Sequence, residues 1–482
     1  MRTPTGARRL PFLIFSIKTR IDMTEQNSPR RVVVTGMGVV SSLGTTLEKL
    51  WAGCREGRSG VRPTRADEPY PVSNVAPVDD FSGQIQDFGE LSDAKKKAIR
   101  KGIKLMAREI QLGVAAAQKA LADARFDEAR LDGALPPRRV GVSFSSDYVY
   151  TTSQELVDAI LACRAADGSL DMPRWPQDGL TKMTPLWQLK YLTNMPASHI
   201  TIYNELYASA HDVTNREAAF GVAIGEAVER IKAGKADGML VGATGSRLES
   251  IRLAAFLNEG ELGADLLDRS TESVSRPFDK RRNGAIPGEG AGALFIEDLE
   301  SAQKRGATIY AEVVGGAYRG SFRHARDVDG WTSNDCQIAQ TFDDARDSIA
   351  SALRALFRKC GISPSDVGFI DANARGDVRL DAAEAAALRE VFGDALDSIP
   401  TTALAGLLGN PGCGCGAIQT VAAILSLRNN ALVPVANLEE QDPACPVAAV
   451  REFGGPTGDS FVKICAQNVG QASAFYVKRY VD

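Results

Sequence analysis

Short apolar runs alternate with longer helical stretches along most of this chain, and this rhythm limits its possible folds more than any other feature. Mainly apolar runs at 32–34, 140–144 and 238–243 are typical of strands buried on both faces. Helical stretches at about 95–124 and 216–233 separate them. Because strand–helix–strand order predicts parallel pairing with right-handed crossovers, we expect an α/β fold.

The second half of the chain repeats this order. Strands are expected at 291–296, 308–314 and 367–371, and helices at 299–305, 343–359, 380–392 and 417–427. Two similar α/β halves are therefore predicted, residues 30–285 and 286–482, with no low-complexity linker between them. Residues 145–210 carry clustered Trp, Tyr and Pro, and we expect there an insertion of short helices that forms a cap or a dimer interface.

Composition and charge exclude several other classes. The chain has 482 residues with 44% hydrophobic and 24% charged side chains, which is ordinary for a globular protein. Its 56 basic and 60 acidic residues give a net charge of −4, which does not support bulk nucleic-acid binding. Eight cysteines without a CxxC pair and three histidines form no zinc pattern. We expect reduced thiols, a cytoplasmic protein, and neither metal nor cofactor.

Residues 1–29 lie outside this alternation of predicted strands and helices. Arg2, Arg8 and Arg9 precede an apolar run at 10–17, which is far shorter than the ~20 residues that span a bilayer. No small-residue cleavage pattern follows the run. We expect no membrane span, and an N-terminal extension that is either disordered or upstream of a true start at Met23.

A series of motifs begins with RRVVVTGMGVVSSLG at 30–44. The most specific one is SRPFDKRRNGAIPGEGAGALFIEDLESAQKRGATIYAEVVG at 275–315, and shorter ones lie at 194–202, 223–244 and 476–480. Together they resemble the β-ketoacyl-carrier-protein synthases of fatty-acid and polyketide assembly, over about residues 30–480. The resemblance implies a thiolase-like fold, with two pseudo-repeated α/β halves in a five-layer stack that is normally dimeric.

The resemblance also implies a catalytic trio, and its three positions hold other residues. Family members load an acyl group onto a Cys at a helix N-terminus, and two His residues assist decarboxylation of a malonyl thioester. The Cys stands seven residues before an Ile-Gly pair, and counting back from Ile224-Gly225 gives Glu217. Asn373 occupies the first His position and Asn410 the second.

Other family positions differ as well. A Lys five residues before the second His is replaced by Ala405, and two pantetheine-contacting Thr are replaced by Arg375 and Asp377. The Gly-Phe-Gly-Gly gating loop becomes Gln-Asn-Val-Gly at 467–470. Asn cannot exchange protons near neutral pH, although its amide donates hydrogen bonds. Because several separate features are lost together, one misaligned motif does not explain them.

Glu217 has two interpretations. Thr214-x-x-Glu217 has the form of a helix capping box, in which the carboxylate satisfies a free N–H at the helix start. Alternatively the carboxylate lies in the former catalytic pocket, held by the amides of Asn373 and Asn410, and mimics a bound malonyl group or acts as a base.

Two further features have open alternatives. Cys413 and Cys415 lie beside Asn410 in the sequence and are either small packed thiols or a relocated nucleophile. A basic stretch on the helix expected at 95–124 is either a solvated face or a docking surface for an acidic acyl carrier protein. Its docking candidates are Lys96, Arg100 and Lys104.

These substitutions favour a ketosynthase-like protein that does not condense acyl groups. We expect one that resembles a chain-length factor, paired with an active ketosynthase as a heterodimer or forming a homodimer. An enzyme of altered chemistry that uses Glu217 as acid or base is the alternative. A condensing acyltransferase is the third option, and it requires a shift in the motif register.

Overall fold

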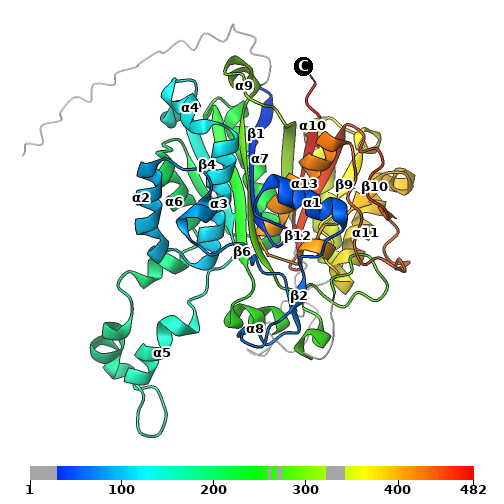
Figure 1. The fold of residues 1–482 in the computed structure, drawn as a ribbon. Coiled ribbons are helices and arrows are strands. Elements are labelled where there is room, and N and C mark those ends of the chain that lie inside the picture. Colours follow the sequence, from blue (N-terminus) through cyan, green and yellow to red (C-terminus); the bar gives the residue numbers. More distant parts are fainter. Residues whose placement is uncertain (1–29, 259–261, 269–273, 322–341, 482) are drawn as a thin grey trace, which may run out of the picture.

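The architecture is built on one continuous sheet of eleven strands. The structure is a computed structural model that describes residues 30–258, 262–268, 274–321 and 342–481. The strand order is β11-β10-β9-β12-β13-β8-β1-β7-β6-β4-β5 (Figure 1). The expectation for residues 1–29 lies outside the described residues.

Each half of the chain supplies one group of strands. The first group is β1 (Val32–Ser41), β4 (Val140–Ser146), β5 (Ala210–Val213), β6 (Gly238–Ser246) and β7 (Glu289–Asp298). The second group is β8 (Ala311–Gly320), β9 (Phe369–Asp371), β10 (Pro400–Thr402), β11 (Ala448–Ala449), β12 (Ser460–Gln467) and β13 (Gln471–Lys478). A separate pair, β2 (Arg62–Pro63) and β3 (Asn74–Val75), lies outside this sheet.

The two groups are arranged alike, which confirms the expected pseudo-repeat. In the first group β7 runs antiparallel to both β1 and β6, while β6, β4 and β5 are parallel. In the second group β13 runs antiparallel to both β8 and β12, while β12, β9, β10 and β11 are parallel. Residue pairs Val33–Glu312 and Val34–Ala311 join β1 to β8. Because β7 pairs within the first group, we propose to divide the halves after residue 304 rather than at 285.

Helices cover both faces of the sheet and fill the space between its halves. None of them, within the described ranges, is long and apolar enough to cross a bilayer. The helices are α1 (Leu47–Glu56), α2 (Asp93–Gly102), α3 (Arg108–Asp123), α4 (Phe126–Leu131), α5 (Ser153–Ala162), α6 (Met195–Asn204), α7 (Ala219–Lys232), α8 (Ser250–Asn258), α9 (Leu299–Lys304), α10 (Phe342–Cys360), α11 (Val378–Phe392), α12 (Ala405–Leu408) and α13 (Gly414–Asn429).

Five layers result, as the thiolase-like fold predicts. Helix α7 packs on β4 and β6 and also on β8 and β13, so it lies between the two halves of the sheet. Helix α13 lies beside it, and every residue from Gly414 to Leu427 is buried. A helix that is buried on all sides suits a central layer. Helix α3 covers β1, β6 and β7 on one outer face, and α10 covers β8 and β13 on the other.

Two glycines allow α3 to approach β1 closely. A Cβ atom on Gly38 would lie 2.1 Å from the carbonyl oxygen of Ala116, and one on Gly36 would lie 2.3 Å from that of Ala120. Any larger residue would push the helix off the sheet. The glycines of the run at 35–38 therefore serve helix–strand packing.

The single helix predicted at 95–124 is wrong, because two helices occupy that segment. Helix α2 ends at Gly102, and α3 begins at Arg108 after a short 3₁₀ turn and an extended Met106. A Cβ atom on Gly102 would lie 1.8 Å from Oη of Tyr203, so α6 packs tightly against the break. Tertiary packing thus overrides a continuous helical pattern.

The insertion expected at 145–210 projects away from the two halves at the lower left of Figure 1. Helix α5 and several short turns form this arm, and α6 returns the chain to β5. Exposed apolar surface of this kind is typical of interaction sites. The exposed apolar side chains of the arm are Tyr148, Tyr150, Val157, Ile160, Leu161, Leu170, Met172, Leu180, Leu186 and Leu192.

Candidate functional site

Glu217 enters the interior from a short turn at the start of α7. Arg216–Ala218 form one 3₁₀ turn, and α7 follows directly from Ala219. Arg216 has a φ of +48°, a left-handed conformation that is uncommon for residues other than glycine. The Glu217 side chain is buried, with 2% of its surface exposed. The turn therefore places a carboxylate inside the protein.

The capping box predicted for Thr214 and Glu217 is wrong. The Thr214 hydroxyl donates to Oδ2 of Asp212 at 2.9 Å, and Asn215 at the N-cap makes no capping hydrogen bond. Glu217 points inward instead of back along the chain because buried donors there bind its carboxylate.

Two ion pairs and one hydrogen bond converge on Oε1 of Glu217. Arg247 Nη2 lies 2.7 Å away and Arg375 Nη1 lies 2.6 Å away, while Asn410 Nδ2 donates a hydrogen bond of 3.2 Å. The two arginine side chains are 0% and 1% exposed. Charge-assisted contacts of this kind are stronger in a buried site than in water. The contacts match the pocket interpretation of Glu217, with Asn410 as one of the two expected amide donors.

These contacts set the charge of Glu217. Burial raises the pKa of the carboxyl group, but the Arg247 and Arg375 guanidiniums lower it, and the net pKa lies well below the usual value for glutamate. Glu217 is therefore an anion at neutral pH. It has no proton to donate as an acid, and its ion pairs make it a weak base.

Arg247 reaches the carboxylate from the end of β6. Its guanidinium carbon lies 3.9 Å from the ring centroid of Phe256 in α8, which is a cation–π contact. Its Nε atom lies 3.8 Å from Oδ2 of Asp147, and that oxygen accepts a hydrogen bond from the Cys413 backbone N–H at 3.1 Å. Arg247 thus joins β6, α8 and the loop that precedes α13.

Asn410 is fixed through its backbone and its side chain. Its N–H donates to the Ile286 carbonyl at 2.8 Å, and its carbonyl accepts from the Gly288 N–H at 3.1 Å. Its Oδ1 accepts from the Gly412 N–H at 2.9 Å. Because Oδ1 is engaged, the amide presents its NH₂ group to Glu217.

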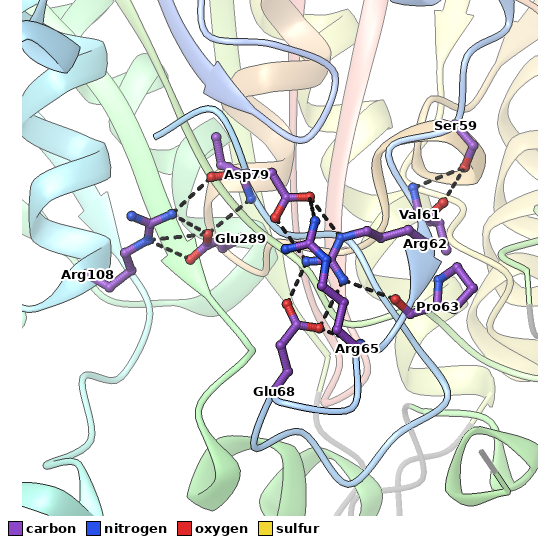
Figure 2. Close-up of polar contacts among 10 residues, drawn as sticks. Ser59, Val61, Arg62, Pro63, Arg65, Glu68, Asp79, Arg108 and Glu289 are labelled. Carbon is purple, nitrogen blue, oxygen red and sulfur yellow. Dashed lines mark hydrogen bonds and ion pairs between the residues drawn. The ribbon is translucent and has the colours of Figure 1, made fainter. Parts of the chain in front are cut away.

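Ion pairs brace the segment beside Gly288 (Figure 2). Arg108 binds both carboxylate oxygens of the adjacent Glu289, and Arg62 bridges Glu68 and Asp79. A cavity of about 350 Å³ lies next to these pairs. The Arg108–Glu289 pair anchors the start of β7, next to the Gly288 that pairs with Asn410. The cavity is lined by Glu68, Pro69, Tyr70, Pro77, Val78, Asp79, Phe81, Arg108, Gln154, Ser246, Leu248, Glu249, Ser250 and Glu289.

Asn373 has a different environment from the other two predicted residues. Its Oδ1 accepts from the Ala466 N–H at 3.1 Å, and its own N–H donates to Oε1 of Glu384 at 2.7 Å. Its Nδ2 has no hydrogen-bond partner among the described residues. The expectation that Asn373 would hold the Glu217 carboxylate is not met, because Arg247 and Arg375 take that place.

Glu384 beneath Asn373 is held in its neutral form. Burial raises the pKa of Glu384 to about 8, although the hydrogen bond from Asn373 acts in the opposite direction. Near pH 7 the group is therefore mainly a carboxylic acid, and it adds little negative charge to the site.

Arg247 and Arg375 are the site residues whose role the sequence did not reveal. Arg375 Nη2 also donates to Oδ1 of Asn468 at 2.5 Å, in the segment that the sequence aligns with the gating loop. The sequence marks Arg375 as a changed pantetheine contact and does not mark Arg247 at all. The available signal is the place of Arg247 shortly after the buried strand predicted at 238–243. An arginine buried there needs an anionic partner, because arginine is almost never fully buried unless it is paired.

The two nearby cysteines do not have the properties of a nucleophile. Burial raises the pKa of Cys413 well above its usual value, and it raises the pKa of Cys415 to about 12. The reactive form of cysteine is the thiolate, which is scarce at such pKa values. The packing interpretation of these thiols is therefore favoured over a relocated nucleophile.

The basic docking candidates lie together on α2 and the turn after it. Arg100 and Lys104 are exposed. Lys96 is partly exposed, and its Nζ atom lies 3.7 Å from Oδ1 of Asp93. Two other basic residues of the stretch are engaged elsewhere, because Lys95 pairs with Asp127 and Arg108 pairs with Glu289. A small basic face remains available on this side of the molecule.

Known proteins resemble this chain over most of its length. Two family models match it: Beta-ketoacyl synthase, N-terminal domain, over residues 29–302, and Beta-ketoacyl synthase, C-terminal domain, over residues 328–439. The 3-oxoacyl-[acyl-carrier-protein] synthase 2 of Synechocystis sp. is 29% identical over 418 residues, which cover 86% of this chain and 90% of that protein. The mitochondrial 3-oxoacyl-[acyl-carrier-protein] synthase of Arabidopsis thaliana is 27% identical over 427 residues, 86% of each chain.

Solved structures share the fold. The ishigamide ketosynthase/chain length factor is 26% identical with a TM-score of 0.74, and a beta-ketoacyl synthase from Burkholderia phymatum is 25% identical with a TM-score of 0.75. Each match covers 94% of this chain and 100% of the other chain.

Proposed function

This chain belongs to the β-ketoacyl synthase family, and on that premise we propose that it is a non-condensing member that pairs with an active ketosynthase. Its role is that of a chain-length factor, which shapes the acyl tunnel of its partner in fatty-acid or polyketide assembly. One observation carries the proposal. The buried carboxylate of Glu217, the residue that the motif spacing aligns with the family's nucleophilic Cys, forms ion pairs with Arg247 and Arg375.

The chemistry of condensation explains why this observation matters. An acyl group transferred from a thioester to a carboxylate forms a mixed anhydride, which is higher in energy than the thioester it replaces. Asn373 and Asn410 offer amide hydrogen bonds but no proton exchange near neutral pH. Neither the covalent step nor the decarboxylation step therefore has its usual group.

The alternative enzyme with Glu217 as acid or base has weaker support. The paired Arg247 and Arg375 hold Glu217 as an anion, and a general acid or base works best with a pKa near the operating pH. We therefore favour the partner role.

Two observations support each of the two proposed partners. One structural neighbour is the ishigamide ketosynthase/chain length factor, and the arm of this chain exposes apolar side chains suited to an interface. The names of the curated relatives specify an acyl carrier protein, and Arg100 and Lys104 offer an exposed basic face to one. We propose a heterodimer first and a homodimer as the alternative.

Co-expression with a ketosynthase that retains its Cys–His–His set tests the partner role. Light scattering after size exclusion is expected to give a heterodimer, since obligate interfaces bury more than ~2,000 Å². Leu161→Asp on the arm is expected to weaken the heterodimer. Leu131→Asp on α4 is the matched control, because both leucines are exposed, at 57% for Leu161 and 82% for Leu131, and only Leu161 lies on the arm. A monomer both alone and with the ketosynthase would overturn the proposal.

A further inference from the structure

The carboxylate of Glu217 sits among donors that come from separate parts of the fold. Arg247 follows β6, Arg375 follows β9 and Asn410 precedes α13, and all three meet at Oε1. Oε2 has no hydrogen-bond partner among the described residues. The framework thus supplies the donors, while the turn before α7 supplies the anion.

Each donor is held in place by contacts that do not involve Glu217. Arg247 lies over the Phe256 ring, and Arg375 donates to Asn468. Asn410 is fixed by two backbone hydrogen bonds and by the Gly412 N–H. Side chains locked in this way form a preorganised site. The donors should keep their positions when the Glu217 side chain is shortened.

We propose that Arg247, Arg375 and Asn410 form a carboxylate-binding site that Glu217 occupies as a tethered ligand. A free small monocarboxylate binds there once the tethered carboxylate is removed. In the natural protein the site is closed to carboxylate-bearing ligands, because the attached group is present at a high effective concentration. This inference goes beyond the proposed partner role and does not require a partner.

Charge and size identify the ligand class. Guanidiniums bind carboxylates through charge-assisted hydrogen bonds, and leaving two of them buried without this anion is unfavourable. Glu217→Ala removes a CH₂–COO⁻ fragment beyond Cβ, which has the size of acetate. The vacated site therefore fits a monocarboxylate of one or two carbons.

Thermal unfolding of the full chain in sodium acetate tests the proposal, with sodium chloride at matched ionic strength as the reference. Glu217→Ala is expected to unfold at a lower temperature than the natural protein in chloride. In about 200 mM acetate it should recover by ~3 °C along a saturating curve. The natural protein and Glu217→Gln should not respond, because the natural carboxylate and the isosteric amide both fill the site.

Line broadening of ¹³C-labelled acetate in NMR spectra measures binding directly. Broadening is expected with Glu217→Ala and should be lost in the double variant Glu217→Ala/Arg375→Gln. A folded Ala variant with equal unfolding temperatures in acetate and chloride would overturn the proposal. If that variant does not fold in chloride, its refolding yields in the two salts are compared, and equal yields also overturn it. Neither result affects the non-condensing role, which rests on the absent nucleophile.

Discussion

Under the proposed alignment of Glu217 with the family's nucleophilic Cys, a carboxylate in place of a thiol changes more than the reacting atom. Glu217 brings a negative charge into the interior. The guanidinium groups of Arg247 and Arg375 compensate this charge, with nitrogen atoms 2.7 Å and 2.6 Å from its Oε1. The motif spacing aligns Asn373 and Asn410 with the family's two histidines, and the Asn410 amide donates a hydrogen bond to the carboxylate. The contacts of this pocket converge on the Glu217 anion, so we expect that a change of Glu217 alone does not restore the family's chemistry.

The first prediction concerns this reversion. Glu217→Cys alone is expected to give less than ~1% of the condensation rate of an active ketosynthase, because catalytic groups that act as a unit are strongly non-additive. The assay is product formation from an acyl and a malonyl carrier protein, followed by mass spectrometry. Substantial turnover by the single variant would show that Asn373 and Asn410 do not stand at the histidine positions.

The second prediction concerns Glu384 and pH. The pKa of Glu384 is about 8 in the folded protein and 4.5 in an ordinary glutamate. A raised pKa means that the folded state holds the proton more tightly, so its stabilising effect is complete below pH 4.5 and is lost as the pH rises toward 8. Glu384→Gln keeps an oxygen that accepts from Asn373 and cannot ionise.

The Glu384→Gln variant should therefore gain stability relative to the natural protein as the pH rises from 5 to 8, by roughly 1–3 kcal/mol at the upper end. Urea unfolding at pH 5, 6.5 and 8 measures the difference. A difference that does not change with pH would contradict the assignment of a neutral Glu384.

Secondary-structure elements followed from the sequence where a local pattern defines them. The strands at 140–144 and 238–243 and the helix at 417–427 were predicted from apolar periodicity, and they appear as β4, β6 and α13. Packing against a distant element is not encoded locally, which is why the break between α2 and α3 at Gly102 was missed.

Only part of the candidate site was predictable from the sequence, because its residues come from distant segments of the chain. The spacing of family motifs led to Glu217 and Asn410, and the structure brings these two residues into contact. Arg375 lies 158 residues from Glu217 along the chain, and no periodicity links them. Charge pairs between remote segments depend on the packed fold, so the Arg247 and Arg375 contacts needed the structure.

The third prediction concerns the basic face of α2 and its following turn. Arg100→Glu/Lys104→Glu is expected to weaken binding of an acidic acyl carrier protein about tenfold at low ionic strength, with a smaller effect at high salt. Lys304→Glu is the control, because this exposed lysine ends α9, and α9 and α2 lie apart in Figure 1. Equal affinity of both variants for the carrier protein, measured by titration calorimetry, would show that the α2 face is solvated and does not dock this protein.

At the scale of the whole molecule, the enclosed site around Glu217 contrasts with the exposed arm around α5. Helices α7 and α13 are enclosed between the two halves, so the site around Glu217 is part of the interior. The arm around α5 extends outward with its apolar side chains exposed (Figure 1). The proposed partner role assigns this outward surface to the contact with another subunit.

Intact-protein mass spectrometry of the isolated full chain tests the central claim most directly. The chain is incubated with an acyl-loaded carrier protein and then with a malonyl-loaded one, beside an active ketosynthase as the positive control. We predict no added acyl mass on this chain and no condensed product, because the nucleophile position holds Glu217 and the thiols of Cys413 and Cys415 stay protonated. An acyl adduct on any residue, together with condensed product, would contradict the non-condensing role.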